Sequence, residues 1–354
     1  MFSRPRPLAE GIAALETQVA GHQGALELLS TVMTLRSAGV LEGAADLHEL
    51  QFDAMGEGFA ALPSHAALLA DGPRTLGWLR ALRRAVRPGQ VVLEIGAGTG
   101  ILSTAAALAG ARRVFAVEST DVAGVAARVA DGNRVGDVVQ LVHGWSTAIA
   151  LSEPADLLVS EILDDDPFQE GVLEATADAR QRHLLPGATV IPSRIRLLGV
   201  PAELAPEELE RHAVTPELLQ RWRDQYGIEL ASLIESMGVG YVVNLLRKHT
   251  ATWTRLGPPV VLADVDFATD FPTALSTVSE LQVSAEGVCH AVLTYFEAQL
   301  DEESAVTTDP LRGDGATSWR NPVFVLARPR RVRAGDSLRL AYRYPGSPSL
   351  ELLP

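Results

Sequence analysis

Residues 93–100 read LEIGAGTG and join an apolar run to three closely spaced glycines. The apolar residues 91–95 predict a buried strand, and the glycines predict a tight turn whose backbone a ligand can approach. The alanine-rich residues 102–109 predict a helix directly after the turn, with its free N–H groups facing the same place. This order indicates an α/β fold with a cofactor-binding loop, for which a plain tight turn is the alternative.

An acidic residue strengthens the interpretation of this loop as a cofactor site. Glu118 ends the next predicted strand, 22 residues after Gly96, where its carboxylate can accept hydrogen bonds from both ribose hydroxyls. This arrangement fits either a dinucleotide or S-adenosylmethionine. Because Gly96, Gly98 and Gly100 have the spacing Gly-x-Gly-x-Gly, the turn is tighter than a pyrophosphate-binding loop. The spacing therefore favours S-adenosylmethionine.

On either side of the loop, short β-branched runs alternate with alanine-rich helical stretches. The predicted strands are residues 91–95, 113–117, 138–142 and 155–160. Strands and helices in alternation predict a parallel sheet with helices on both faces. We expect this Rossmann-like domain to span residues 59–193. Before it, apolar residues at steps of three and four predict a helical hairpin within residues 1–58.

The pattern changes to period two after about residue 190. Residues 189–198 alternate in the manner of a half-buried strand, and further alternating runs occupy residues 260–267, 287–300, 321–326 and 338–344. Gly, Pro and Asp separate these runs, which predicts an antiparallel sheet or barrel over residues 194–354. A charged helical insertion is expected at about residues 205–250.

Composition excludes several classes of protein. The 30 basic and 44 acidic residues give a formal net charge of −14, which argues against nucleic acid as the main partner. The single cysteine, Cys289, excludes an internal disulfide and favours a cytoplasmic location. The sequence contains no apolar run of about 18 residues, so no membrane span is predicted. The histidines lack the spacing of metal ligands, so no metal is expected.

An acidic loop follows the fourth predicted strand. Residues 160–170 read SEILDDDPFQE, with Glu161 at the carboxyl end of the strand, where open α/β sheets bind their ligands. Glu170 comes nine residues later, far enough for a loop to return it to the same place. A solvated acidic loop is the alternative.

This loop resembles the double-glutamate loop of the protein arginine methyltransferase family, in which two glutamates hold the substrate guanidinium. The resemblance extends in order over about residues 50–345. It implies a class I methyltransferase domain, a β-barrel and a helical dimerisation arm, here near residues 216–237, and hence a homodimer. The residues that it places in the cofactor site are His65, Arg74, Gly96, Gly98, Gly100, Glu118, Ser146 and Thr147. Arg74 would contact the cofactor carboxylate, and Ser146 and Thr147 would lie near the adenine.

The loop is most similar to that of the monomethylating branch of the family. Ile162 would place a branched side chain near the attacking nitrogen, which predicts a monomethylated product. Trp319 falls on the family's Thr-His-Trp loop, but Ser318 stands where that loop has histidine, so no His–Asp pair with Asp71 can form.

Two further departures lie near the substrate end of the site. Residues 52–55 read FDAM, so Phe52 remains from the helix that covers the cofactor but its second aromatic is missing. The three aspartates that begin at Asp164 are unusual. They are predicted to be solvated, or one of them receives the α-ammonium of a free amino acid.

Three functions remain open from the sequence. In the first, the chain would methylate free L-arginine to Nω-monomethyl-L-arginine in a natural-product pathway. In the second it would methylate arginine in proteins, and in the third it would bind the cofactor without turnover. Intact Glu161, Glu170 and Arg74 argue against the last. The altered substrate end favours free arginine, and so does the resemblance, since bacterial relatives act mostly on small molecules. One lysine among 30 basic residues indicates a GC-rich bacterial genome.

Overall fold

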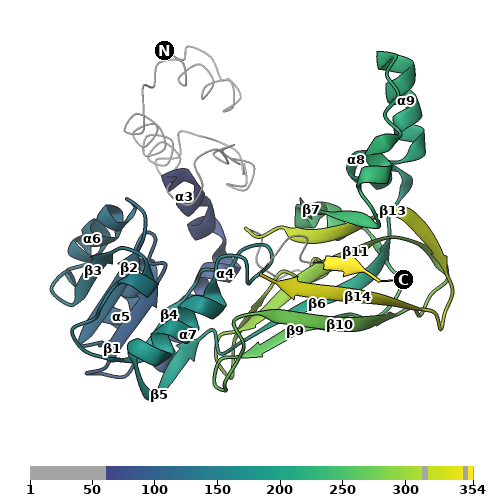
Figure 1. Ribbon diagram of the computed structural model, residues 1–354. Coiled ribbons are helices and arrows are strands. Elements are labelled where there is room, and N and C mark those ends of the chain that lie inside the picture. Colours follow the sequence, from purple (N-terminus) through teal and green to yellow (C-terminus); the bar gives the residue numbers. More distant parts are fainter. Residues whose placement is uncertain (1–60, 313–317, 346–349, 354) are drawn as a thin grey trace, which may run out of the picture. The chain divides into compact units, whose positions relative to one another are not determined.

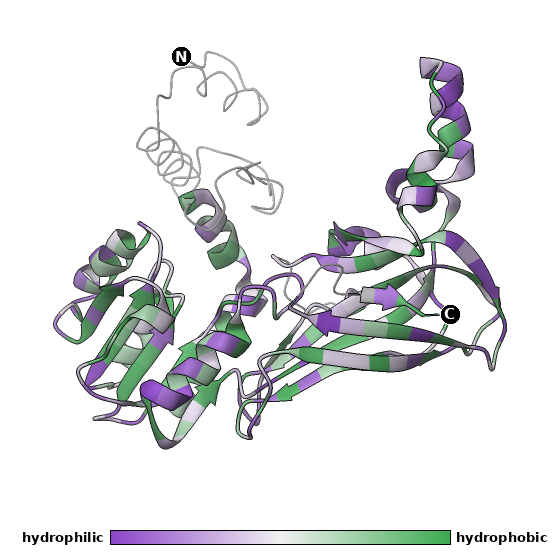
Figure 2. Cartoon of the chain, viewed as in Figure 1, coloured by the Kyte–Doolittle hydropathy of each residue, from purple (hydrophilic) through white to green (hydrophobic). Residues whose placement is uncertain are grey.

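The computed structural model describes residues 61–312, 318–345 and 350–353 (Figure 1). The hairpin predicted within residues 1–58, and Phe52 with it, lie outside the described residues. In Figure 2 hydrophobic residues follow the strands of the parallel sheet, as expected for strands that are covered by helices. No helix of the described part is long and apolar enough to cross a membrane.

The first domain contains a parallel sheet, as predicted, with five strands in the order β3-β2-β1-β4-β5. Its strands are β1 (Val91–Ile95), β2 (Arg113–Glu118), β3 (Val139–His143), β4 (Ala155–Ser160) and β5 (Leu184–Ile191). The chain passes outward from β1 to β3 and then returns to the other side of β1 to form β4. The carboxyl ends of β1 and β4 therefore flank the point where the strand order reverses, which is where such sheets bind ligands.

Helices cover both faces of this sheet. They are α3 (Leu62–Ala70), α4 (Gly72–Ala85), α5 (Ile101–Leu108), α6 (Ala123–Gly132) and α7 (Val172–Arg182). Along β1, Val92 packs in the core with residues of α4 and α5, whereas its neighbours Val91 and Leu93 pack with residues of α7. Both sides of β1 are buried, which explains its uninterrupted apolar sequence.

The second domain is antiparallel. Its strands are β6 (Arg194–Glu203), β7 (Gly240–Leu245), β8 (Thr254–Arg255), β9 (Val260–Asp266), β10 (Leu275–Gln282), β11 (Gly287–Gln299), β12 (Ala305–Thr307), β13 (Asn321–Val332), β14 (Ser337–Tyr344) and β15 (Leu350–Leu352). A seven-stranded sheet has the path β7-β13-β11-β6-β8, with β9 beside β6 and β12 beside β11. A three-stranded sheet has the order β10-β14-β15.

The prediction of one continuous strand over residues 189–198 is wrong. The structure divides it into β5, which ends at Ile191 in the parallel sheet, and β6, which begins at Arg194 in the antiparallel sheet. Pro192 lies between them and has no N–H to donate to a ladder, so neither strand continues through it. This proline marks the passage from one sheet to the other.

The charged insertion between β6 and β8 contains short helices. These are α8 (Pro206–His212), α9 (Pro216–Tyr226), α10 (Ser232–Ser236) and α11 (Arg247–Thr250), with β7 between the last two. In α9, Thr215 caps the first turn by accepting a hydrogen bond from the Leu218 N–H at 3.2 Å. Gly227 ends the same helix with a φ of +69°, a conformation that favours glycine.

Candidate active site at the carboxyl ends of β1 and β4

The glycine loop and Glu118 are joined by a direct hydrogen bond. The Gly98 N–H donates to Oε2 of Glu118 at 2.8 Å. The other carboxylate oxygen of Glu118 accepts from the N–H and the hydroxyl of Thr120, each at 2.8 Å. These bonds hold the carboxylate at the edge of the loop, where the sequence predicted the ribose site.

Two predicted site residues close over the loop. A Cβ atom at Gly98 would lie 3.0 Å from Cε1 of His65, and the φ of Gly98 is +52°. A Cβ atom at Gly96 would collide with the side chain of Ile162. The glycines therefore let an imidazole from α3 and an aliphatic side chain from the acidic loop approach the backbone. Gly100 begins α5 in the same left-handed conformation, with a φ of +77°.

Arg74 and Glu161 form an ion pair in the middle of the site. Arg74 lies in the first turn of α4, where Asp71 accepts its backbone N–H at 3.2 Å. Its guanidinium binds the carboxylate of Glu161, with the two side chains only 10% and 14% exposed. The guanidinium carbon also lies 5.0 Å from the ring centre of Trp319, within cation–π range. The pair is therefore shielded from water.

Two atoms of this pair are left for a ligand. Nε of Arg74 and Oε1 of Glu161 are buried, and neither has a hydrogen-bond partner among the described residues. Buried polar atoms in native proteins almost always have partners, so each of these atoms is suited to a bound group. Arg74 can donate to a carboxylate, and Glu161 can accept from a cation.

Glu170 ends the turn before Gly171, within electrostatic range of Glu161. That glycine has a φ of +81° directly before α7, a conformation that favours glycine. Burial, together with the charges of Glu161 and Asp164, raises the pKa of Glu170 to about 8. Burial also raises the pKa of Glu161, although the Arg74 guanidinium opposes that shift. Two carboxyls in a dry site are thus available to a cation.

The aspartates of the acidic loop hold it against the β domain. Asp165 accepts the Arg320 N–H at 2.7 Å, and Asp166 accepts the Tyr342 hydroxyl at 3.0 Å. Burial raises the pKa of Asp165 to about 6 and also raises that of Asp166. The prediction that all three aspartates are solvated is therefore wrong, because two of them bind donors of the other domain. Within the described part of the chain, Asp164 accepts a hydrogen bond only from the Asp165 N–H, at 2.7 Å.

Ser318 and Trp319 fasten the same loop and the start of α4. The N–H and the hydroxyl of Ser318 both donate to Oδ2 of Asp71 at 2.7 Å. Serine thus keeps a link to Asp71 at the place where the resembled family has histidine. Trp319 donates its indole N–H to the carbonyl of Leu163 at 2.6 Å. Trp319 therefore holds the loop in position beneath the Arg74 guanidinium.

Ser146 and Thr147 lie in a short 3-10 helix, Ser146–Ala148, after β3. The Gly144 N–H before this helix donates to the carbonyl of Glu118 at 2.9 Å, which brings the turn beside the predicted ribose site. Thr147 is exposed and Ser146 is half-buried. Their contact with an adenine stays a prediction.

Sequence reasoning missed Glu94. This residue lies in the middle of β1, is fully buried and accepts a hydrogen bond from the Ser103 hydroxyl of α5. Burial raises its pKa to about 8, so the side chain is neutral at pH 7. An acidic residue inside an otherwise apolar five-residue strand is the signal that could have revealed it.

Comparisons with known proteins identify the family of this chain. The family model described as ribosomal protein L11 methyltransferase matches residues 71–196, and the arginine methyltransferase oligomerization subdomain matches residues 208–347. The arginine N(omega)-methyltransferase of Streptomyces achromogenes subsp. streptozoticus is 31% identical over 283 residues, 78% of this chain and 74% of that relative. The chain belongs to the arginine N-methyltransferase family.

The chain is also similar to protein arginine N-methyltransferases of plants and a trypanosome. The protein arginine N-methyltransferase PRMT10 of Oryza sativa subsp. japonica is 27% identical over 278 residues, 72% of each chain. A Trypanosoma brucei PRMT1 enzyme-prozyme complex with AdoHcy has a TM-score of 0.71 at 23% identity, covering 83% of this chain and 94% of that chain. Arabidopsis thaliana PRMT10 has a TM-score of 0.64 at 22% identity, covering 80% and 88%. These structures share the fold.

The residues present fit S-adenosylmethionine, the methyl donor of this arginine N-methyltransferase. The Gly98 N–H holds one oxygen of Glu118 at the edge of the loop, and Thr120 holds the other. The buried Nε of Arg74 supplies a donor for a carboxylate. Glu118 would hold the ribose and Arg74 the carboxylate of the cofactor.

Proposed function

We propose that this arginine N-methyltransferase acts on free L-arginine and gives Nω-monomethyl-L-arginine. The observation that carries the proposal is a third carboxylate, Asp164, beside the paired Glu161 and Glu170. Its charge contributes to the raised pKa of Glu170, which supports a position close to the paired glutamates. The other two aspartates are occupied by donors of the β domain. Asp164 is therefore available for an α-ammonium group, which a residue within a protein lacks.

The two glutamates reduce the electrostatic repulsion between the cationic substrate and the cationic methyl donor. A guanidinium has a pKa above about 12 and arrives as a cation, and the methyl donor is a cation as well. Two unit charges 4 Å apart repel by about 4 kcal/mol at an effective dielectric constant near 20. Glu161 and Glu170 offset this repulsion and orient the guanidinium through charge-assisted hydrogen bonds. Fixed orientation contributes on the order of 7–11 kcal/mol to such displacements.

The cofactor supplies an electrophilic methyl group on sulfur. Glu161 and Glu170 localise a lone pair on the attacking nitrogen, and the product must then lose a proton. Glu170, whose pKa is about 8, is the better acceptor of that proton at neutral pH. Glu161→Gln is expected to keep the fold and cofactor binding while turnover falls by orders of magnitude. Turnover near that of the wild type would contradict the assignment.

Arg74 links cofactor and substrate binding in this proposal. Its guanidinium forms an ion pair with Glu161, the carboxylate that would bind the substrate. A cofactor carboxylate competes for Arg74 and so frees Glu161 for the substrate. Calorimetry is expected to show tighter binding of L-arginine in the presence of S-adenosylhomocysteine than in its absence. Equal affinity under both conditions would refute this coupling.

A side-by-side assay tests the substrate. Purified protein and S-adenosylmethionine are offered free L-arginine or a Gly-Arg-rich peptide, and products are identified by mass. We expect a gain of one methyl group on free arginine alone. Asp164→Asn is expected to slow the reaction of L-arginine more than that of Nα-acetyl-L-arginine amide, with Asp178→Asn on α7 as the control. Methylation of the peptide alone would establish the alternative, a protein arginine N-methyltransferase.

We also propose monomethylation. The side chain of Ile162 lies against Gly96, next in sequence to Glu161, and would limit the room beside the attacking nitrogen. We therefore expect no appreciable dimethylated product. Dimethylarginine in the mass spectrum would contradict this expectation.

We also propose a homodimer that forms through the helical insertion. The matched oligomerization subdomain begins at residue 208, within this insertion. Its exposed apolar side chains include Tyr226, Ile228 and Val239. Light scattering at micromolar concentration is expected to give the mass of two chains, and a monomer would overturn the proposal.

A further inference from the structure

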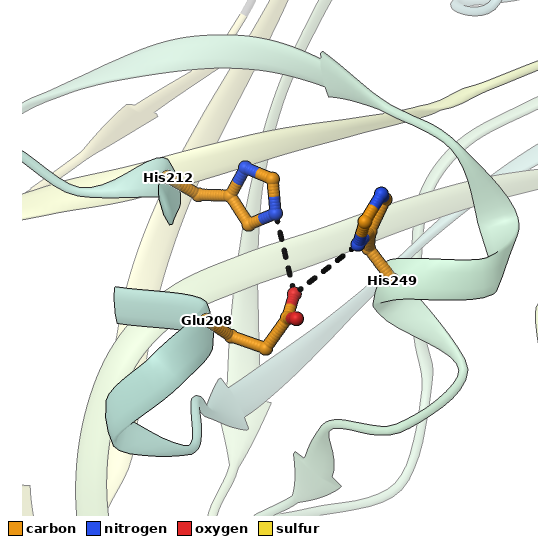
Figure 3. A group of neighbouring side chains, drawn as sticks. All are labelled: Glu208, His212 and His249. Carbon is orange, nitrogen blue, oxygen red and sulfur yellow. Dashed lines mark ion pairs between the residues drawn. The ribbon is translucent and has the colours of Figure 1, made fainter. Parts of the chain in front are cut away.

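Three side chains outside the active site converge on one point at the base of the helical insertion. Glu208 and His212 lie one turn apart on α8, and His249 lies on α11, the last helix of the insertion. Figure 3 shows the carboxylate and both imidazole rings pointing toward one another. One ligand atom from each residue lies within 4.8 Å of the other two.

The distances match those between ligands of one metal ion. Nε2 of His212 lies 3.2 Å from Oε2 of Glu208, and Nδ1 of His249 lies 3.6 Å from the same oxygen. Zinc binds nitrogen and oxygen at about 2.0–2.2 Å, so neighbouring ligands of a tetrahedral site are about 3.3 Å apart. The cluster therefore needs only small side-chain movements to hold an ion.

The orientation of His212 supports a metal over a hydrogen-bonded cluster. Its Nε2 is buried and, within the described part of the chain, has no hydrogen bond of acceptable geometry despite its closeness to Oε2. Two ligands of one metal ion are close together without a hydrogen bond between them, because the lone pair of each is directed at the ion and not at the other ligand. A buried ring nitrogen without a partner is rare in proteins.

Arg211 and Trp253 already orient the carboxylate of Glu208. Arg211 donates to Oε1 of Glu208 at 2.8 Å, which leaves Oε2 for the ion. The Trp253 indole N–H lies 3.5 Å from Oε2 and restrains it from another side. Glu208 itself is only 6% exposed. Outer groups of this kind fix the direction of metal ligands.

We propose that Glu208, His212 and His249 bind one Zn²⁺ per chain, with water as the fourth ligand. Two imidazoles and a carboxylate are a donor set that suits zinc. The ion joins α8, before α9, to α11, after it, and so fixes the two ends of the insertion to each other. The role proposed for the ion is to stabilise the insertion, at a place outside the methyl-transfer site.

Zinc binding by untagged, full-length protein tests this proposal. After treatment with chelator, the protein is titrated with Zn²⁺ against a chromophoric competitor, and bound metal is counted by elemental mass spectrometry. We expect one Zn²⁺ per chain. Glu208→Gln and His249→Ala are expected to weaken binding by about 100-fold or more, since loss of a group that only hydrogen-bonds to a metal ligand already costs about 10- to 100-fold.

Matched variants separate this site from other zinc-binding residues. Glu207→Gln changes the exposed neighbour on the same helix, and His143→Ala removes an exposed histidine of β3; both are expected to bind zinc like the wild type. Zn²⁺ is also expected to raise the melting temperature of the wild type but not that of His249→Ala. Circular dichroism verifies that each variant is folded. Absence of zinc binding by the wild type, or wild-type binding by folded Glu208→Gln and His249→Ala, would overturn the proposal.

Discussion

Glu170 is expected to set the pH dependence of methyl transfer. Burial, with the charges of Glu161 and Asp164, raises its pKa to about 8. A carboxyl with this pKa is ionised in about one molecule in eleven at pH 7 and in about ten in eleven at pH 9. Because the guanidinium cation binds the ionised form, kcat/KM is expected to rise about tenfold between pH 7 and pH 9.

The assay measures kcat/KM by mass spectrometry with Nα-acetyl-L-arginine amide, whose α-nitrogen does not titrate in this range. Asp164→Asn removes one of the charges that raise the pKa of Glu170, so the midpoint is expected to move to lower pH. Asp178, which pairs with Arg182 on α7, provides the control: Asp178→Asn is expected to leave the midpoint unchanged. A flat profile from pH 7 to 9, or a midpoint that Asp164→Asn does not move, would refute the reasoning.

Three other variants, and a fourth that serves as a control, test buried contacts. Burial raises the pKa of Glu94 from its ordinary value of 4.5 to about 8. The folded state therefore holds this proton more tightly, and the free energy of unfolding falls as pH rises from about 4.5 to about 8. Between pH 6 and 9 this fall amounts to about 2–3 kcal/mol. Glu94→Gln is expected to abolish it, as measured by urea unfolding. Tyr342→Phe deprives Asp166 of a buried donor and is expected to cost about 1–3 kcal/mol in unfolding free energy and to slow turnover. Tyr344→Phe, on the same strand, is expected to leave turnover unchanged. Gly98→Ala places a methyl group 3.0 Å from an imidazole at a φ of +52°, and calorimetry is expected to show about tenfold weaker binding of S-adenosylhomocysteine.

Each of these expectations has a result that contradicts it. The pH dependence of unfolding could be the same in Glu94→Gln as in the wild type, which would mean that Glu94 is ionised in the fold. Equal loss of turnover in both tyrosine variants would show that the contact with Asp166 has no special role. Unchanged affinity of Gly98→Ala for S-adenosylhomocysteine would place the cofactor away from this loop.

Much of the first domain could be predicted because its signals are local. The strand at residues 91–95 needed only an apolar run, and the loop after it needed only glycines. The double-glutamate loop was recognisable because Glu161 ends a strand and Glu170 follows at a fixed distance. In contrast, residues 189–198 alternate without interruption, and the break at Pro192 becomes visible only when the two halves join different sheets.

The acidic loop shows where sequence reasoning ended. Three consecutive aspartates are solvated in most sequences, so solvation was the reasonable prediction. Two of them are instead held by donors that lie about 155 and 176 residues away in the chain. The distance in sequence between Asp166 and Tyr342 left no local pattern from which this contact could be read.

The sequence by itself determined the parallel sheet, the glycine loop and the residue types that methyl transfer to a guanidinium requires, because these depend on periodicity and on neighbours along the chain. Only the tertiary structure decided that Arg74 occupies Glu161, that Ser318 binds Asp71, and which of the aspartates are occupied. It alone brought His249 to Glu208. Such contacts arise when elements distant in sequence pack together, and the burial that shifts the pKa of Glu170 exists only in the folded chain.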